Sequence, residues 1–298
     1  MRVEIATVSF LTQKLGIHSL FLYFWNRKWF RNLINLPRRI VFQLTGRRKL
    51  AERFDASEIE KISADLKVNG IAITHIDKLH DMPSMAELQK EYEILLEIES
   101  KKPHSRKSKA FIERLIDDDY DFKSNQDSAI HRFVSNPALK LISENYLEMV
   151  PKLTSFKIWR SHFTGDPNRT ASQNWHRDYN EFQMVRVFLY FNEVKRENGA
   201  GEFVIGTHYL GDSYGILEYS EELGTYATDE EIEQNFSVER IVCATGTPGT
   251  LVFMDTAGLH RGGYHSKPSE RRVSLLTFST AADIMPTKLR LKHLARKR

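Results

Sequence analysis

The run Met184-Val-Arg-Val-Phe-Leu-Tyr-Phe191 is a strong strand signal, because β-branched and aromatic side chains favour the pleated surface of a sheet. Asn198-Gly-Ala-Gly201 follows it with the composition of a turn, and a second short run begins at Glu202-Phe-Val-Ile205. Two such runs on either side of a glycine-containing turn predict a β-hairpin.

Similar short runs recur through the second half of the chain, separated by Gly, Pro and Asn. They lie at 154–163, 201–205, 250–254 and 272–279, and Thr247-Pro-Gly249 is expected to turn the chain before the third of them. Many short strands with regular turns are typical of sandwiches and barrels. The expected fold class is therefore mainly β with α: a double-stranded β-helix of the jelly-roll or cupin-like kind, with N-terminal helices packed outside.

Upstream of Pro151 the pattern is mostly helical. Helices are expected at 55–68, 84–102 and 128–148, with Pro137 opening a new helix in its first turn, and residues 70–74 are expected to form a short strand. The predicted organisation is a basic, aromatic extension at 1–50, a mostly helical region at 51–150 that packs on the core, a jelly-roll core at 151–287 and a basic tail at 288–298.

Composition and charge set further bounds. The single cysteine, Cys243, excludes an internal disulfide and a structural zinc site built from thiolates, which favours a reducing, cytoplasmic location. Residues 1–50 carry ten Lys or Arg against one acid, a net charge of +9, and residues 288–298 add six basic residues and no acids. Since the whole chain carries +4, the residues between these ends carry −11. Basic ends on an acidic body suggest an anionic surface or partner for the ends.

The N-terminal extension also contains many aromatic residues. Its apolar run from Ile17 to Trp25 is too short to span a bilayer and lacks the small-residue site of a secretory signal. Aromatic bulk interleaved with Lys and Arg suits a helix that lies on an anionic membrane, such as the inner face of a cell membrane. The alternative is an extra helix that packs its aromatic side on the domain. No nucleic-acid motif accompanies the basic ends, so specific binding of nucleic acid is not expected.

The candidate chemistry lies in Trp175-His-Arg-Asp178. In an extended chain, side chains alternate between faces, so His176 and Asp178 point the same way and Arg177 points away. His260 is the best third ligand, because it follows a predicted strand within a glycine-containing segment that allows close approach. Two imidazoles and one carboxylate on one face of a metal leave three positions open, which is typical of non-haem iron(II) oxygenases.

A 2-oxo acid bound at such a metal would need a fixed cationic partner for its distal carboxylate, and arginine suits that role better than lysine. Arg271 and Arg272 lie at the start of a predicted strand, eleven and twelve residues after His260, and only one of them can face inward. His162, His208 and His265 are interpreted as surface or hydrogen-bonded residues. His-Arg-Asp also occurs in protein kinases, but no glycine-rich loop or Asp-Phe-Gly accompanies it here.

Four linked motifs between about Ser155 and Ala282 resemble the phytanoyl-CoA dioxygenase family of iron(II)- and 2-oxoglutarate-dependent oxygenases. The residues that carry the resemblance are Ser172-Gln-Asn-Trp-His-Arg-Asp178; Val187 to Val194 with Glu197-Asn-Gly199 and Phe203-Val-Ile-Gly-Thr-His208; Pro248 to Phe253 with Asp255-Thr-Ala-Gly-Leu-His-Arg-Gly-Gly263; and Glu270-Arg-Arg-Val273. The first 150 residues resemble nothing that we can name.

The resemblance implies iron held by His176, Asp178 and His260, with 2-oxoglutarate and dioxygen as co-substrates. Arg271 fits the family's spacing slightly better than Arg272, although Arg272-Val-Ser274 resembles an arginine–serine pair of related oxygenases. Lys157 is a candidate for assisting the co-substrate, with a surface lysine as the equal alternative. Gln173 and Trp175 are expected to line the pocket, and ordinary core packing is the alternative for Trp175.

The expected function is hydroxylation of an unactivated C–H bond of a small-molecule, lipid-like or amphiphilic substrate, with release of succinate and carbon dioxide. Because Asp178 is a carboxylate, no metal position is left for a halide, so hydroxylation is favoured over halogenation. The alternatives are a metal-binding jelly-roll module without catalysis and a peripheral membrane interaction protein, since a fold alone does not establish activity.

Overall fold

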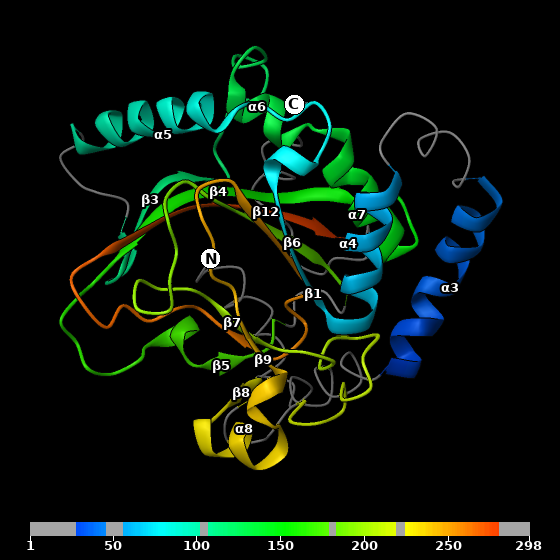
Figure 1. The fold of residues 1–298 in the computed structure, drawn as a ribbon. Helices are drawn as coiled ribbons and strands as arrows, with labels where there is room; N and C mark the ends of the chain where they lie inside the picture. The colour runs from blue at the N-terminus through cyan, green and yellow to red at the C-terminus, as the bar shows by residue number, and fades with distance from the viewer. Residues whose placement is uncertain (1–27, 46–55, 102–106, 179–182, 219–223, 280–298) are drawn as a thin grey trace, which may run out of the picture.

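The computed structural model describes residues 28–45, 56–101, 107–178, 183–218 and 224–279. Two antiparallel sheets lie face to face at its centre, and helices cover the outer face of the larger sheet (Figure 1). The predicted fold class, a β-helix core with helices packed outside, is confirmed. The terminal segments 1–27 and 288–298, for which surface contact was predicted, lie outside the described residues.

The larger sheet has seven strands in the order β1-β10-β6-β12-β4-β3-β2. Their bounds are β1 Ile71–His75, β2 Lys107–Lys109, β3 Ile112–Asp117, β4 Lys152–His162, β6 Val185–Tyr190, β10 Thr250–Met254 and β12 Glu270–Ser279. Three of these strands precede residue 150, so the sheet takes strands from both sides of the predicted boundary between the helical region and the core. That boundary stays a prediction.

The smaller sheet has five short strands in the order β8-β5-β11-β7-β9. They are β5 Trp175–His176, β7 Glu202–Val204, β8 Tyr226–Ala227, β9 Ile241–Cys243 and β11 His260–Arg261. Helix α8 (Asp229–Asn235) packs against the outer face of this sheet through Ile232, beside Phe236. The Thr247–Thr250 turn forms as predicted, with Gly249 at φ +94° and the Thr250 amide donating to the Thr247 carbonyl over 3.0 Å.

The predicted hairpin of 184–191 with 202–205 is wrong, because the two runs lie in different sheets. β6 pairs with β10 on one side and β12 on the other, so neither of its edges is left for β7. β7 pairs instead with β11 and β9. The turn at Asn198-Gly199 does reverse the chain, but it carries the chain across the sandwich from one sheet to the other.

The helices are α3 (Lys28–Thr45), α4 (Ala56–Asn69), α5 (Met85–Ser100), α6 (Ala129–Val134) and α7 (Pro137–Leu147). Pro137 opens α7 as predicted, since its missing amide hydrogen is not needed in the first turn. Ser84 and Glu87 form a reciprocal capping box at the start of α5. No helix in the described part of the chain has the length and apolarity needed to cross a lipid bilayer.

Two apolar clusters hold these layers together. The larger one joins α4–α7 to the outward side chains of the large sheet, among them Phe156, Val187, Leu189 and Leu276. The second fills the space between the sheets with Trp159, Tyr190, Val273 and Leu275 from the large sheet and Phe203 from the small one. Side chains of the second set alternate with those of the first along each strand. The inner face of the sandwich therefore carries the residues that can meet a bound molecule.

Candidate metal centre

His176, Asp178 and His260 come together at one end of the small sheet. β5 and β11 pair with His176 directly opposite His260, and the centroids of the two rings are 4.3 Å apart. The carboxylate of Asp178 lies 3.6 Å from His260 Nε2, measured to Oδ2. One possible ligand atom from each residue lies within 4.8 Å of the others. Among the described residues, this is the group of His, Cys, Asp and Glu whose geometry suits a metal ion.

Backbone carbonyls orient both imidazoles. His176 Nδ1 donates to the Asn174 carbonyl over 2.9 Å, and His260 Nδ1 donates to the Gly258 carbonyl over 3.0 Å. A proton held on Nδ1 leaves the lone pair of Nε2 available to a metal. The pKa of His260 is lowered to about 3, mainly by burial and next by the charge of His176. Asp178 has a smaller, opposite effect. His260 is therefore neutral at physiological pH, which is the form of an imidazole that can bind a metal.

Asp178 is held from two sides. Its backbone amide donates to the Thr256 carbonyl over 2.8 Å, which ties it to the segment leading to His260. Its Oδ2 lies 2.6 Å from Arg186 Nη1. Burial works against ionisation of Asp178, but Arg186, His260 and His176 outweigh it, and the pKa of the carboxyl lies well below its usual range. The carboxylate is thus ionised and available as a ligand.

The sequence analysis did not single out Arg186, although a signal for it was present. A charged residue in the middle of a buried strand needs a partner, and Arg186 stands within the apolar run of β6. Its side chain shares the inner face with Phe188 and Tyr190, which pack between the sheets.

Arg177 points away from the metal centre, as strand alternation predicts, and is buried on the other side. Its guanidinium donates to five carbonyls, those of Thr207, Tyr214, Ile216, Leu217 and Ala257. It also lies over the ring of Tyr214, with Cζ 5.7 Å from the centroid. Through these contacts Arg177, which lies between His176 and Asp178 in the sequence, holds segment 207–217 and Ala257, three residues before His260, in place.

The two arginines of β12 face opposite ways. Arg271 lies on the inner face with Val273 and is buried between the sheets, where burial lowers its pKa. Its Nη1 donates to the Gly199 carbonyl, while its Nε is buried without a hydrogen-bond partner. Arg272 faces outward, where it pairs with Glu270 and Glu93 and lies over the ring of Tyr92.

A second buried donor without a partner lies close in register to Arg271. Trp159 stands opposite Val273, two residues along from Arg271, and its Nε1 hydrogen has no acceptor. An unmet buried N–H is costly, so an acceptor group bound on this inner face would be favoured by both donors. Ser274, the residue of the arginine–serine pattern, faces away from this space, beside Leu276 on the helix side.

Lys157 is neither a surface lysine nor unpartnered. It lies opposite Leu275 on the inner face, and its Nζ is 3.0 Å from Asp117 Oδ1 and 3.3 Å from Asp118 Oδ2. Its assistance to a co-substrate stays a prediction.

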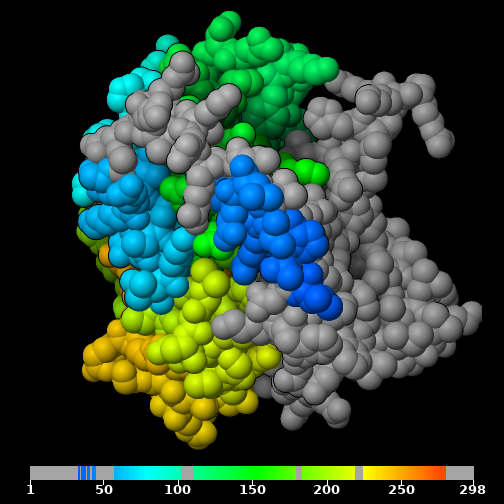
Figure 2. All heavy atoms as spheres, turned by 90° about the vertical axis from the view of Figure 1, so that its right-hand side faces the viewer, coloured from blue at the N-terminus to red at the C-terminus, as the bar shows by residue number. Residues whose placement is uncertain are grey.

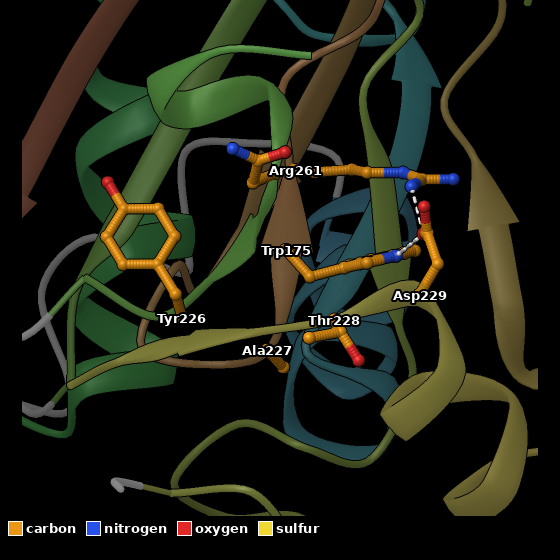
Figure 3. A pocket seen from close by; sticks show the side chains of 7 residues that line it. Trp175, Tyr226, Ala227, Thr228, Asp229 and Arg261 are labelled. Atoms are coloured by element: carbon orange, nitrogen blue, oxygen red, sulfur yellow. Dashed lines mark hydrogen bonds and ion pairs between the residues drawn. The ribbon is translucent and has the colours of Figure 1, made fainter. Parts of the chain in front are cut away.

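The expectation that Trp175 lines the metal pocket is wrong. Because neighbouring strand residues face opposite sides, Trp175 and Arg261 lie on the outer face of the small sheet, behind His176 and His260. There the Arg261 guanidinium stacks 4.4 Å from the indole centroid, and both side chains bond Asp229, Trp175 through Nε1 over 2.9 Å (Figure 3). They border a hollow of about 500 Å³ that also includes Ala227 and Thr228.

Gln173, His208 and His265 have hydrogen-bonding roles. Gln173 Oε1 accepts from the Thr170 amide over 3.0 Å, so it caps a short 3-10 turn, Ala171–Gln173. His208 Nε2 is 3.1 Å from the Lys67 carbonyl, and His265 Nε2 is 3.0 Å from Ser161 Oγ. Tyr226, not singled out in the sequence, stacks on His176 with centroids 5.6 Å apart and is 43% exposed.

Comparison with known proteins extends the sequence resemblance. The model of the family described as "Phytanoyl-CoA dioxygenase (PhyH)" matches residues 54–273. The match begins well before residue 150, so the helical region that resembled nothing nameable is part of it. No curated protein matches the sequence.

Solved structures share the fold. The epimerase SnoN, solved with Fe³⁺, alpha ketoglutarate and nogalamycin RO, is 13% identical, with a TM-score of 0.55 over 76% of this chain and 85% of that one. The carbocyclase SnoK from nogalamycin biosynthesis is 14% identical, with a TM-score of 0.53 over 84% and 94%. EctD from S. alaskensis, solved with 2-oxoglutarate and 5-hydroxyectoine, is 16% identical, with a TM-score of 0.50 over 75% and 76%.

Proposed function

Because the chain belongs to the phytanoyl-CoA dioxygenase family, we propose that it is an iron(II)- and 2-oxoglutarate-dependent oxygenase whose metal is held by His176, Asp178 and His260. The observation that carries the proposal is the convergence of these three side chains within 4.8 Å. Two imidazoles and a carboxylate are the ligand set of non-haem iron oxygenases.

The inner face also fits the co-substrate. A dicarboxylate that chelates the metal at one end needs a buried cation at the other, and Arg271 offers an unmet Nε hydrogen on that face. We assign Arg271, not Arg272, to the distal carboxylate of 2-oxoglutarate, because Arg272 is already paired with two glutamates outside the sandwich. The unmet Nε1 of Trp159 is a second donor on the same face.

Iron and 2-oxoglutarate, when bound, supply dioxygen activation coupled to decarboxylation, with succinate and carbon dioxide as products. The protein's own groups supply orientation and electrostatics. The Asn174 and Gly258 carbonyls fix the two imidazole tautomers, and Arg186 fixes the carboxylate of Asp178. Apolar residues between the sheets keep water away from the co-substrate.

We propose hydroxylation of a C–H bond in a small molecule as the outcome, since Asp178 fills the position that a halide would need. An epimerase and a carbocyclase are among the proteins that share the fold. Product analysis therefore has to look for stereochemical inversion and ring closure as well as for an added oxygen atom.

The direct test is anaerobic addition of iron(II) and then 2-oxoglutarate to the purified protein. The chelate is expected to give a weak visible charge-transfer band, and admission of air with candidate substrates is expected to release succinate. His176→Ala is expected to abolish both signals, while His80→Ala, at an exposed histidine paired with Asp81, is expected to retain them. Absence of the band in the unmodified protein would contradict the proposed function and favour a jelly roll without oxygenase activity.

A further inference from the structure

Helix α3 presents its apolar side to the outside. Leu33, Leu36, Ile40 and Leu44 are 63%, 52%, 47% and 80% exposed. Their spacing of three, four and four residues puts them on one stripe of a helix. We call these four residues the apolar ridge. Figure 2 shows α3, in blue, on the surface of the molecule.

The described side chains on the buried side of α3 include polar ones as well as Phe42. Asn35 is fully buried there, next to Phe42 in the helical pattern, and Arg39 Nη2 donates to Gln183 Oε1 over 3.1 Å. A helix that merely covers a domain hides its apolar stripe and turns polar residues to water. In α3 four large aliphatic side chains lie outside, while an amide and a guanidinium lie with Phe42 on the buried side. Packing on the described part of the domain therefore does not account for its leucines.

The charge of the helix indicates what covers the ridge. Besides Arg39, which bonds Gln183, the helix contains Lys28, Arg31 and Arg38 and no Asp or Glu. Arg47, Arg48 and Lys49 follow it in the sequence. An apolar stripe on a purely basic helix matches the boundary of an anionic bilayer, where apolar side chains enter the acyl region and cations meet the headgroups. We propose that α3 docks the protein on an anionic lipid membrane through the apolar ridge.

The docking helix is joined to the metal centre. Gln183, which accepts from Arg39, lies five residues after Asp178, and its Nε2 donates to the Tyr146 carbonyl over 3.1 Å. Tyr146 in turn donates to Asp255 Oδ2 over 2.6 Å, five residues before His260. A membrane-bound α3 would thus hold the segments that carry the metal ligands near the lipid surface. This favours an amphiphilic substrate, an extension that rests on the proposed oxygenase function.

Sedimentation of the full-length protein with vesicles tests the docking directly. We expect binding to phosphatidylcholine vesicles containing phosphatidylglycerol, weakening with added salt, and little binding to phosphatidylcholine alone. The double variant Leu36→Ser/Ile40→Ser is expected to lower the partition coefficient by roughly tenfold or more. The control Ile94→Ser/Ile98→Ser changes two similarly exposed residues of α5 and is expected to bind like the unmodified protein.

Three results would overturn the proposal. They are absence of binding by the unmodified protein, equal binding by the ridge variant, and a ridge variant that only converts a dimer to a monomer in light scattering without vesicles. Circular dichroism and thermal melting confirm that both double variants are folded. The charge-transfer band is measured without vesicles. A protein that binds vesicles but gives no band would count against the oxygenase function alone. A protein that gives the band but does not bind vesicles would count against docking by α3 alone.

Discussion

At the scale of single residues, Arg186 is expected to hold the Asp178 carboxylate in position for a metal. Its guanidinium lies 2.6 Å from Asp178 Oδ2 and helps to hold the pKa of that carboxyl below its usual range. Arg186→Gln is expected to weaken binding of manganese(II), a stand-in for iron, by about 10- to 100-fold, as for other groups that orient a ligand. The pKa of Asp178 rises in this variant, so metal binding is lost at a higher pH as the solution is acidified. Titration calorimetry between pH 5 and 8 measures both effects; identical curves would show that the ion pair is dispensable.

Tyr146 acts at the same scale on stability. Its hydroxyl donates to the fully buried Asp255, and burial, followed by the charge of Asp255, keeps its pKa well above the usual value. Tyr146→Phe leaves a buried carboxylate short of one donor, which is expected to cost about 1–3 kcal/mol of unfolding free energy. Urea denaturation measures this cost. Tyr226→Phe, at an exposed ring, is the control and is expected to change stability by less than about 0.5 kcal/mol.

At the scale of elements, the turn before β10 depends on Gly249. Its φ is +94°, and an added Cβ would lie 2.5 Å from His75 Nε2. Gly249→Ala is expected to destabilise the protein by more than about 1 kcal/mol, because the positive φ alone costs about that much. Gly215→Ala is the matched control, since a Cβ there meets nothing within 4 Å. Equal melting temperatures for the two variants would contradict this account.

The elements also show how far a single sequence can predict a fold. Alternation located β4, β6, β10 and β12 to within two residues, and Pro137 marked the start of α7, because these signals are local. The partner of β6 could not be found in this way. A glycine turn specifies that the chain reverses, whereas β10 and β12, which occupy both edges of β6, are supplied by residues more than fifty positions away.

The same limit applies within the candidate site. Strand alternation put His176 and Asp178 on one face. The same rule places Trp175 on the other face, although Trp175 was expected to line the metal pocket. Which of Arg271 and Arg272 faces inward depends on the phase of β12 against β4, where Arg271 meets Ser161. Arg186 and the carbonyl contacts of Arg177 depend on residues brought together only by the complete fold.

At the scale of the whole molecule, metal and co-substrate are expected to stabilise the folded state, because the three ligand candidates come from separate parts of the chain. Manganese(II) with 2-oxoglutarate at a hundred times its dissociation constant adds about 2.7 kcal/mol. For a chain of this size that corresponds to a rise in Tm of several degrees, at about 2–4 °C per kcal/mol. Thermal melting with and without EDTA measures the shift. Asp178→Ala should melt at the same temperature in both solutions, and a full shift in that variant would place the metal elsewhere.

β5 and β11 contain two residues each, and each strand gives one side chain to either surface of the small sheet. Behind the imidazoles of His176 and His260 stand Trp175 and Arg261, which are stacked together and bonded to Asp229 on α8. The carboxylate of Asp229 on the outer face therefore contacts two residues that are each directly adjacent in sequence to a candidate metal ligand. We expect substitutions at Asp229, Trp175 and Arg261 to be tolerated less well than at other surface positions, although none of the three is itself a candidate metal ligand.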